Sequence, residues 1–136
     1  MEQNLYSLYK RALDSRAPWL SRWESARRYT MPDTDADMAT LYDATAMDAM
    51  DNLSASIYTL LTPPESLWLQ LVGESDMSPN AEHATNVLRA NLNDSNFYTT
   101  IHQCYMDLVV LGTACLFMGQ NPIGASSAFN FTAIPM

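Results

Sequence analysis

Apolar and polar positions follow their clearest pattern between Tyr42 and Leu71. Apolar side chains recur there at intervals of three and four residues, the spacing of one helix face; they are Met47, Met50, Leu53, Ile57, Leu60 and Leu61. Asp43 is a suitable N-cap, and Tyr42 before it is placed to close a hydrophobic staple on Met47. Pro63-Pro64 ends the pattern because proline lacks a backbone donor. The pattern predicts a central helix over residues 43–62, buried along Met50, Leu53, Ile57 and Leu61.

The N-terminal stretch shows the same helical spacing. Residues 2–29 carry one apolar stripe on each side of Pro18. Proline removes a backbone donor and crowds the preceding turn, so we expect a kink or a restart of the helix near residues 15–18. Residues 1–29 are therefore predicted to form a basic helical arm.

A helical pair is predicted over residues 78–112. Ser78 is a suitable N-cap and Pro79 suits the first helical position. The turn at 93–96 separates the two helices and supplies a cap for the second. Gly112 follows the last periodic residue and suits a left-handed C-cap.

Three short stretches have the composition of strands: Leu67–Val72, Thr113–Met118 and Ala128–Ile134. The last two predict a β-hairpin over residues 113–134, and an isolated hairpin is only marginally stable in water. We therefore expect this sheet to acquire further strands. The fold class is α+β, mainly α-helical with about four helices and a small antiparallel sheet at the C-terminal end, in a single domain spanning 1–136.

Four short motifs occur in order along the chain. The first motif holds Asp43, Thr45 and Ala46, and the second holds Thr62, Pro63 and Pro64 followed by Trp68. The third motif holds Ser95, Asn96 and Phe97, and the fourth holds Gly112 and Thr113. A weaker fifth places Trp23 and Arg27 ahead of Met31-Pro32. Together they resemble the N-terminal portion of the head-to-tail connecting (portal) proteins of short-tailed bacteriophages.

The resemblance implies a structural subunit and no enzyme. Such a subunit would form a dodecameric ring at the head-to-tail vertex of the virion, assembled in the host cytoplasm, and its channel would pass double-stranded DNA during packaging and ejection. Its partners would be other copies of itself, the packaging terminase, scaffold or capsid proteins and tail adaptor proteins. The chain would be the wing-region-like N-terminal part of a longer protein, and no cofactor is implied.

Charge is distributed unevenly along the chain. The net charge is −8, yet residues 1–28 carry six basic and three acidic side chains, a balance of +3, which leaves −11 for the rest. An acidic surface does not hold DNA firmly, because binding depends on contacts between cations and phosphates. It suits a wall past which DNA slides, or simply keeps the protein soluble.

Candidate chemistry is sparse. His83 and His102 are predicted to be structural, and Cys104 and Cys115 to be free thiols with no metal-ligand spacing. Asp33, Asp35 and Asp37 alternate as in a calcium loop, but Met38 and Ala44 replace the glycine and the glutamate that such a loop needs. The acids Asp43, Asp48 and Asp51 are more consistent with a cap and a solvated helix face than with a magnesium site. The sequence therefore predicts no catalytic residue, metal site or cofactor.

Two alternatives to the structural subunit remain open. Arg22, Arg27 and Arg28 lie among aromatic residues, a pattern found in surfaces that bind single-stranded nucleic acid. The commoner outcome of this pattern is arginine stems packed on tryptophan faces or paired with acids of a neighbouring subunit. The runner-up function is a soluble helical binding or adaptor module from a bacterium, and a metal-dependent hydrolase is third. Size in solution distinguishes a ring from an adaptor.

Overall fold

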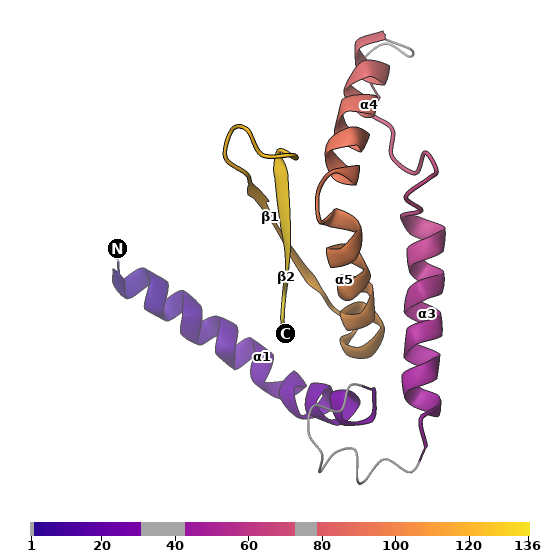
Figure 1. Ribbon diagram of the computed structural model, residues 1–136. Coiled ribbons are helices and arrows are strands. Elements are labelled where there is room, and N and C mark those ends of the chain that lie inside the picture. Colours follow the sequence, from indigo (N-terminus) through magenta and orange to yellow (C-terminus); the bar gives the residue numbers. More distant parts are fainter. Residues whose placement is uncertain (1, 31–42, 73–78) are drawn as a thin grey trace. The chain divides into compact units, whose positions relative to one another are not determined.

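The computed structural model describes residues 2–30, 43–72 and 79–136 (Figure 1). The chain divides into two compact units, Met1–Ala49 and Met50–Met136, and the boundary falls inside a helix. The described elements are helices followed by a C-terminal antiparallel hairpin, which confirms the predicted α+β class. Tyr42, Ser78 and the acidic loop around Asp35 lie outside the described residues, so the staple, the Ser78 cap and that loop stay predictions.

The first unit is dominated by helix α1 (Glu2–Thr30), which contains Pro18. The helix is continuous, so of the predicted kink or restart there is no restart. The ribbon of α1 changes direction part-way along its length (Figure 1). A kink is expected in a helix that contains Pro18, because proline lacks a backbone donor and crowds the preceding turn.

Helix α3 (Thr45–Leu61) lies within the predicted range, but the face it buries differs from the predicted one. Met50 is buried and Ser54 is completely inaccessible to solvent, whereas Leu53 is 51% exposed and Leu61 is 59% exposed. The predicted burial of Leu53 and Leu61 is therefore wrong. The physical reason is the small Ser54 side chain, which allows close approach of a neighbouring element that a leucine stripe would keep at a distance.

Helices α4 (Pro79–Asn93) and α5 (Phe97–Leu111) form the predicted pair. Pro79 occupies the first helical position, as predicted. Gly112 ends α5 in the left-handed conformation with φ of 73°, and its N–H donates to the carbonyl oxygen of Leu108. This C-cap is confirmed, and glycine suits it because the positive φ strains any residue that has a Cβ.

The hairpin consists of β1 (Cys115–Gln120) and β2 (Phe129–Ile134). The strands pair antiparallel, with Met118 opposite Phe131 and Gln120 opposite Phe129. Phe129 and Phe131 share the face that packs against the core. The hairpin is thus confirmed. β1 begins and ends two residues later than the predicted Thr113–Met118, and β2 begins one residue later than the predicted Ala128–Ile134.

The core of the second unit is a cluster of Leu92, Phe97 and Phe131, with partly buried residues from every side packed on it: Trp68, Leu69, Leu88, Tyr98, Ile101, Leu116 and Phe129. In Figure 1, α5 lies between α3 and the hairpin. Edge-to-face contact of Tyr58 with His102 joins α3 to α5, and contact of Phe97 with Phe131 joins α5 to β2.

The strand predicted over Leu67–Val72 is wrong. This segment follows α3 without regular secondary structure and has no strand beside it among the described residues. Its only described long-range backbone bond is from Leu71 N–H to the Thr85 hydroxyl on α4. Strand propensity is therefore present, but a strand also requires a partner backbone.

Ser54 provides a test of the observed face of α3. Ser54→Leu adds three carbons at a position with no free space, so we expect a loss of about 1–3 kcal/mol in the free energy of unfolding. Ser56→Leu is the matched control, because Ser56 is exposed on the same helix and the change there should stay within about 0.5 kcal/mol. Urea unfolding measures both, and equal stability of the two variants would contradict the assignment of the buried face.

Candidate functional site

The residues of the first motif form the start of α3. The Asp43 carboxylate accepts hydrogen bonds from the Thr45 hydroxyl at 2.6 Å and from the Thr45 backbone N–H at 2.9 Å. These two bonds lower the pKa of Asp43, the hydroxyl bond having the larger effect. Ala46 is exposed. Asp43 is thus a helix-start residue that acts through Thr45, consistent with the predicted cap.

The second motif connects α3 to the core. Thr62 is buried, and its hydroxyl accepts a 3.4 Å hydrogen bond from the Tyr105 hydroxyl on α5. The chain then turns at Pro63-Pro64, where Ser66 N–H donates to the Pro63 carbonyl oxygen. The turn delivers Trp68 onto Phe97, with the two rings stacked 5.8 Å apart and nearly parallel.

The third motif ties the helical pair to the hairpin. The Ser95 hydroxyl accepts a bond from Phe97 N–H at the start of α5. The Asn96 side-chain amide donates to the Phe131 carbonyl oxygen at 2.7 Å and accepts from the Phe131 N–H at 2.8 Å. Asn96 thereby occupies the outer edge of β2 as a neighbouring strand would.

The fourth motif holds the end of α5. Gly112 supplies the left-handed cap described above, and the partly buried Thr113 lies in the connection ahead of β1. The structure thus gives the motif residues of the second unit a shared role, since Thr62, Trp68, Asn96, Phe97 and Gly112 all fix the junctions between α3, α5 and the hairpin. Sequence reasoning could not assign these roles, because the partners lie up to 43 residues away.

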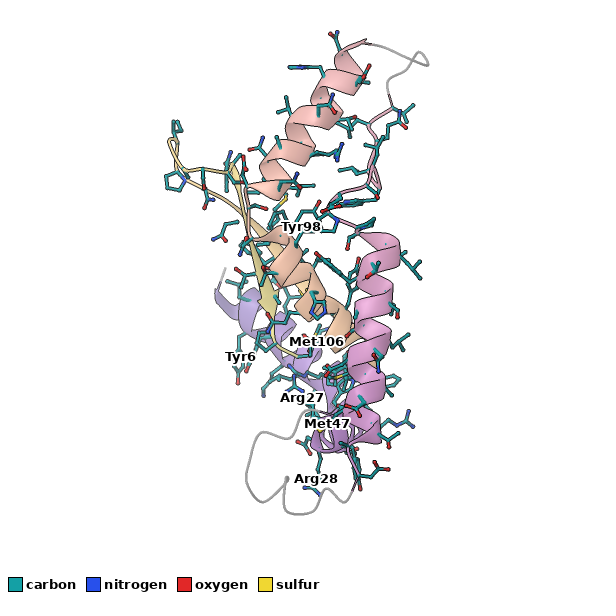
Figure 2. All side chains as sticks on the ribbon, turned by 45° about the vertical axis from the view of Figure 1, so that its right-hand side comes forward. Tyr6, Arg27, Arg28, Met47, Tyr98 and Met106 are labelled. Atoms are coloured by element: carbon teal, nitrogen blue, oxygen red, sulfur yellow. The ribbon has the colours of Figure 1, made fainter. Side chains whose placement is uncertain are left out.

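Three basic side chains of α1 lie over aromatic rings of the same helix. Lys10 lies 5.4 Å from the centroid of Tyr6, Arg16 5.3 Å from Trp23, and Arg22 5.5 Å from Trp19. Of the three arginines predicted as possible contacts, Arg22 thus lies over a tryptophan of its own helix, and the contact role of Arg22, Arg27 and Arg28 stays a prediction. Figure 2 shows the remaining pair, Arg27 and Arg28, in the last turn of α1.

The histidines and cysteines do not converge on a reactive site. His102 contacts the edge of Tyr58, and His83 is exposed. Cys104 is buried and free, and burial, followed by the nearby Asp107 carboxylate, raises the pKa of its thiol above the usual value. Cys115 is also free and is half-buried. Within residues 2–30, 43–72 and 79–136, no three side chains of metal-ligand type gather, and no helix is long and apolar enough to cross a membrane.

Exposed apolar surface is the most prominent feature of the described chain. On α1 it includes Leu5, Tyr6, Leu8, Tyr9, Leu13, Trp19, Leu20 and Tyr29. On α3 it includes Leu53 and Leu60, seven residues apart beside the buried face. Large exposed apolar areas mark surfaces that contact other molecules. Leu53 and Leu60 form a second, exposed apolar stripe on α3 that sequence reasoning missed. It could have been recognised because α3 has more apolar positions than one buried face can hold.

A family model described as "Bacteriophage head to tail connecting protein" matches residues 2–136. No curated protein matches the chain.

Asn96 generates a prediction about the hairpin. Asn96→Ala leaves the Phe131 N–H and carbonyl without their partners, so we expect a loss of about 1–2 kcal/mol in the free energy of unfolding. Asn93→Ala is the matched control, because Asn93 is exposed near the end of α4. Denaturant unfolding gives both values, and an Asn96→Ala variant as stable as the control would show that the amide does not hold β2.

Asp43 generates a prediction about pH. Because its folded-state pKa is lowered from 3.8, its contribution to stability is present at neutral pH and is lost as pH falls through the folded value. Thr45→Val removes the hydroxyl donor and should raise the pKa of Asp43 towards 3.8. Thr59→Val, farther along the same helix, should leave it unchanged. An NMR titration of the Asp43 carboxyl measures this, and an unchanged pKa in Thr45→Val would contradict the proposed cause.

Proposed function

The chain belongs to the family of bacteriophage head-to-tail connecting proteins, and from this we propose that it is a subunit of a closed ring at the vertex where head and tail meet. The family assigns it a structural role in the virion, in contact with other head and tail proteins. The ring would surround the channel through which DNA is packaged and ejected. The observation that carries the proposal is the family match over residues 2–136 together with the exposed apolar surface.

A ring is consistent with the surface of the described chain. Subunits related by rotation bury different patches on their two sides, and the contact repeats until the circle closes. Exposed leucines and aromatic residues on α1 and α3 supply apolar area that a single copy leaves in water. The proposed stoichiometry is twelve, as the resemblance to portal proteins implies.

The same proposal implies the binding partners of the ring and the part of a portal subunit that this chain represents. The packaging terminase, scaffold or capsid proteins and tail adaptor proteins would bind the ring, which would assemble in the host cytoplasm. The chain would supply the wing-region-like N-terminal part of a portal subunit. DNA would pass the ring without being held, because residues 29–136 carry a net charge of −11.

The basic arm is proposed to contribute to subunit contact. Residues 1–28 carry +3 against −11 in the remainder, so an arm and a neighbouring body attract one another. Trp19 and Leu20 are exposed on the arm and would add an apolar contact that salt does not weaken.

Removal of the arm tests this contact. We expect the chain lacking residues 1–28 to sediment as a smaller assembly than the complete chain. Arg27→Glu with Arg28→Glu should have this effect mainly at low salt, because exposed charges more than about 10 Å apart are screened at 0.1 M salt.

The control for the arm is Arg89→Glu, which reverses the only basic residue outside it. Sedimentation velocity at two salt concentrations measures all four proteins. An assembly of unchanged size after the deletion would show that the arm packs within its own subunit, and a monomeric complete chain at every concentration would argue for the adaptor function.

A further inference from the structure

The outer edge of β1 is unpaired in the described chain. Asn121 N–H donates to the Ala128 carbonyl oxygen, which marks this pair as hydrogen-bonded in the antiparallel ladder. Hydrogen-bonded pairs alternate with non-bonded pairs, so the N–H and carbonyl groups of Leu116 and Met118 point away from β2. The bonds from Asn96 to Phe131, which lies opposite Met118, agree with this alternation. Within residues 50–72 and 79–136, no hydrogen bond reaches those outward groups.

The two edges of the hairpin differ at the pair formed by Met118 and Phe131. The Asn96 amide occupies the edge of β2 at Phe131, while no side chain among the described residues of the second unit takes the equivalent place beside β1. A strand that pairs along the full length of this sheet therefore joins β1, where no such side chain interrupts the edge.

The sequence of β1 lacks the charges, the proline and the bulge with which many proteins protect an edge strand. Its sequence, Cys-Leu-Phe-Met-Gly-Gln, contains no charged residue and no proline, and it is regular along its whole length. Phe117 is 57% exposed and Met118 is 60% exposed. Such an edge is a template for an extended backbone with apolar side chains.

The segment Leu67–Val72 has the composition of such a strand, although it has no regular secondary structure within one copy. It is uncharged, and Val72 is 77% exposed. Leu71 N–H donates to the Thr85 hydroxyl on α4. Successive N–H groups of an extended chain point to opposite sides, so in an added strand the N–H groups of Gln70 and Val72 would point away from α4. Among the described residues, no hydrogen bond reaches the N–H of Gln70 or Val72.

The two surfaces do not meet within one copy of the second unit. Trp68 stacks on one side of Phe97, and Phe131 of β2 contacts Phe97 in turn. β1 lies beyond β2, because the other edge of β2 faces Asn96. A single copy therefore keeps a strand-like segment on one side and an open edge on the other (Figure 1).

We propose that Leu67–Val72 of one copy adds to the outer edge of β1 in the next copy, forming an intersubunit three-stranded sheet. This inference rests on the proposed ring and specifies which surfaces of neighbouring subunits meet in it. The two surfaces differ, so the contact is head-to-tail and repeats around a closed axis. Both surfaces are uncharged in a chain of net charge −8, so two copies meet there with the least like-charge repulsion.

Proline substitutions test each half of the contact separately. Met118→Pro removes an outward N–H of β1 that the hairpin itself does not use, and edge strands accept proline at such positions. Gln70→Pro removes an outward N–H of the segment. We expect each variant of the complete chain to self-associate at least roughly tenfold more weakly than the parent. Met118→Ala and Gln70→Ala are the matched controls, because they keep the N–H, and should associate nearly as the parent does.

A mixture of the two proline variants gives the sharpest result. Met118→Pro still offers an intact segment and Gln70→Pro still offers an intact β1, so together they should form one contact and stop at a dimer. Sedimentation velocity of each variant and of the mixture measures this. Self-association of Gln70→Pro at parental strength would overturn the proposal in favour of pairing between two β1 edges.

Amide hydrogen exchange of the unmodified chain is independent of whether the proline variants fold. The amides of Met118 and Gln70 should exchange at least roughly tenfold more slowly at concentrations where the chain assembles, and both should speed up together on dilution. If the parent assembles but these amides do not slow, the strand contact is wrong while the ring stands. If the parent does not assemble at any concentration, both the ring and the contact fail.

Discussion

The packing of Trp68, Phe97 and Phe131 is the interaction on which the second unit depends. Phe97 stacks on Trp68 and meets Phe131 edge-on with centroids 5.1 Å apart, so one side chain joins the connection after α3 to α5 and the hairpin. Aromatic pairs of this geometry contribute about 0.5–1.5 kcal/mol each beyond the burial of their surface. The two prolines after Thr62 serve this contact, because they end α3 and direct the chain towards Phe97.

Side-chain amides hold the hairpin by hydrogen bonds, in addition to the aromatic contacts. A two-stranded hairpin has two open edges and is marginally stable alone. Asn96 bonds Phe131 on one edge, and the Asn121 side-chain amide donates to the carbonyl oxygens of Ser127 in the connection and Phe129 at the start of β2. The second edge has no such amide in the described part of the unit. The structure thus closes one side of the sheet and leaves the other available, which is the asymmetry that a head-to-tail contact needs.

The sequence predicted the positions of the helices better than it predicted which helix face is buried. Periodicity and proline placed α3, and Gly112 ended α5, because these signals are local. The buried face of α3 was misassigned because Leu53 and Met50 are equally apolar, and only the neighbour decides which of them is covered. The strand predicted at Leu67–Val72 is absent for a related reason, since the composition is that of a strand but no partner strand lies beside it among the described residues. The role of Asn96 was inaccessible, because its partner Phe131 lies 35 residues away.

Ring formation is the central claim, and direct imaging tests it more simply than any variant does. Electron microscopy of the purified chain at concentrations where it assembles should give class averages of closed rings with one rotational symmetry and a central opening. Particles of a single copy, open filaments or two-fold dimers at every concentration would contradict the account.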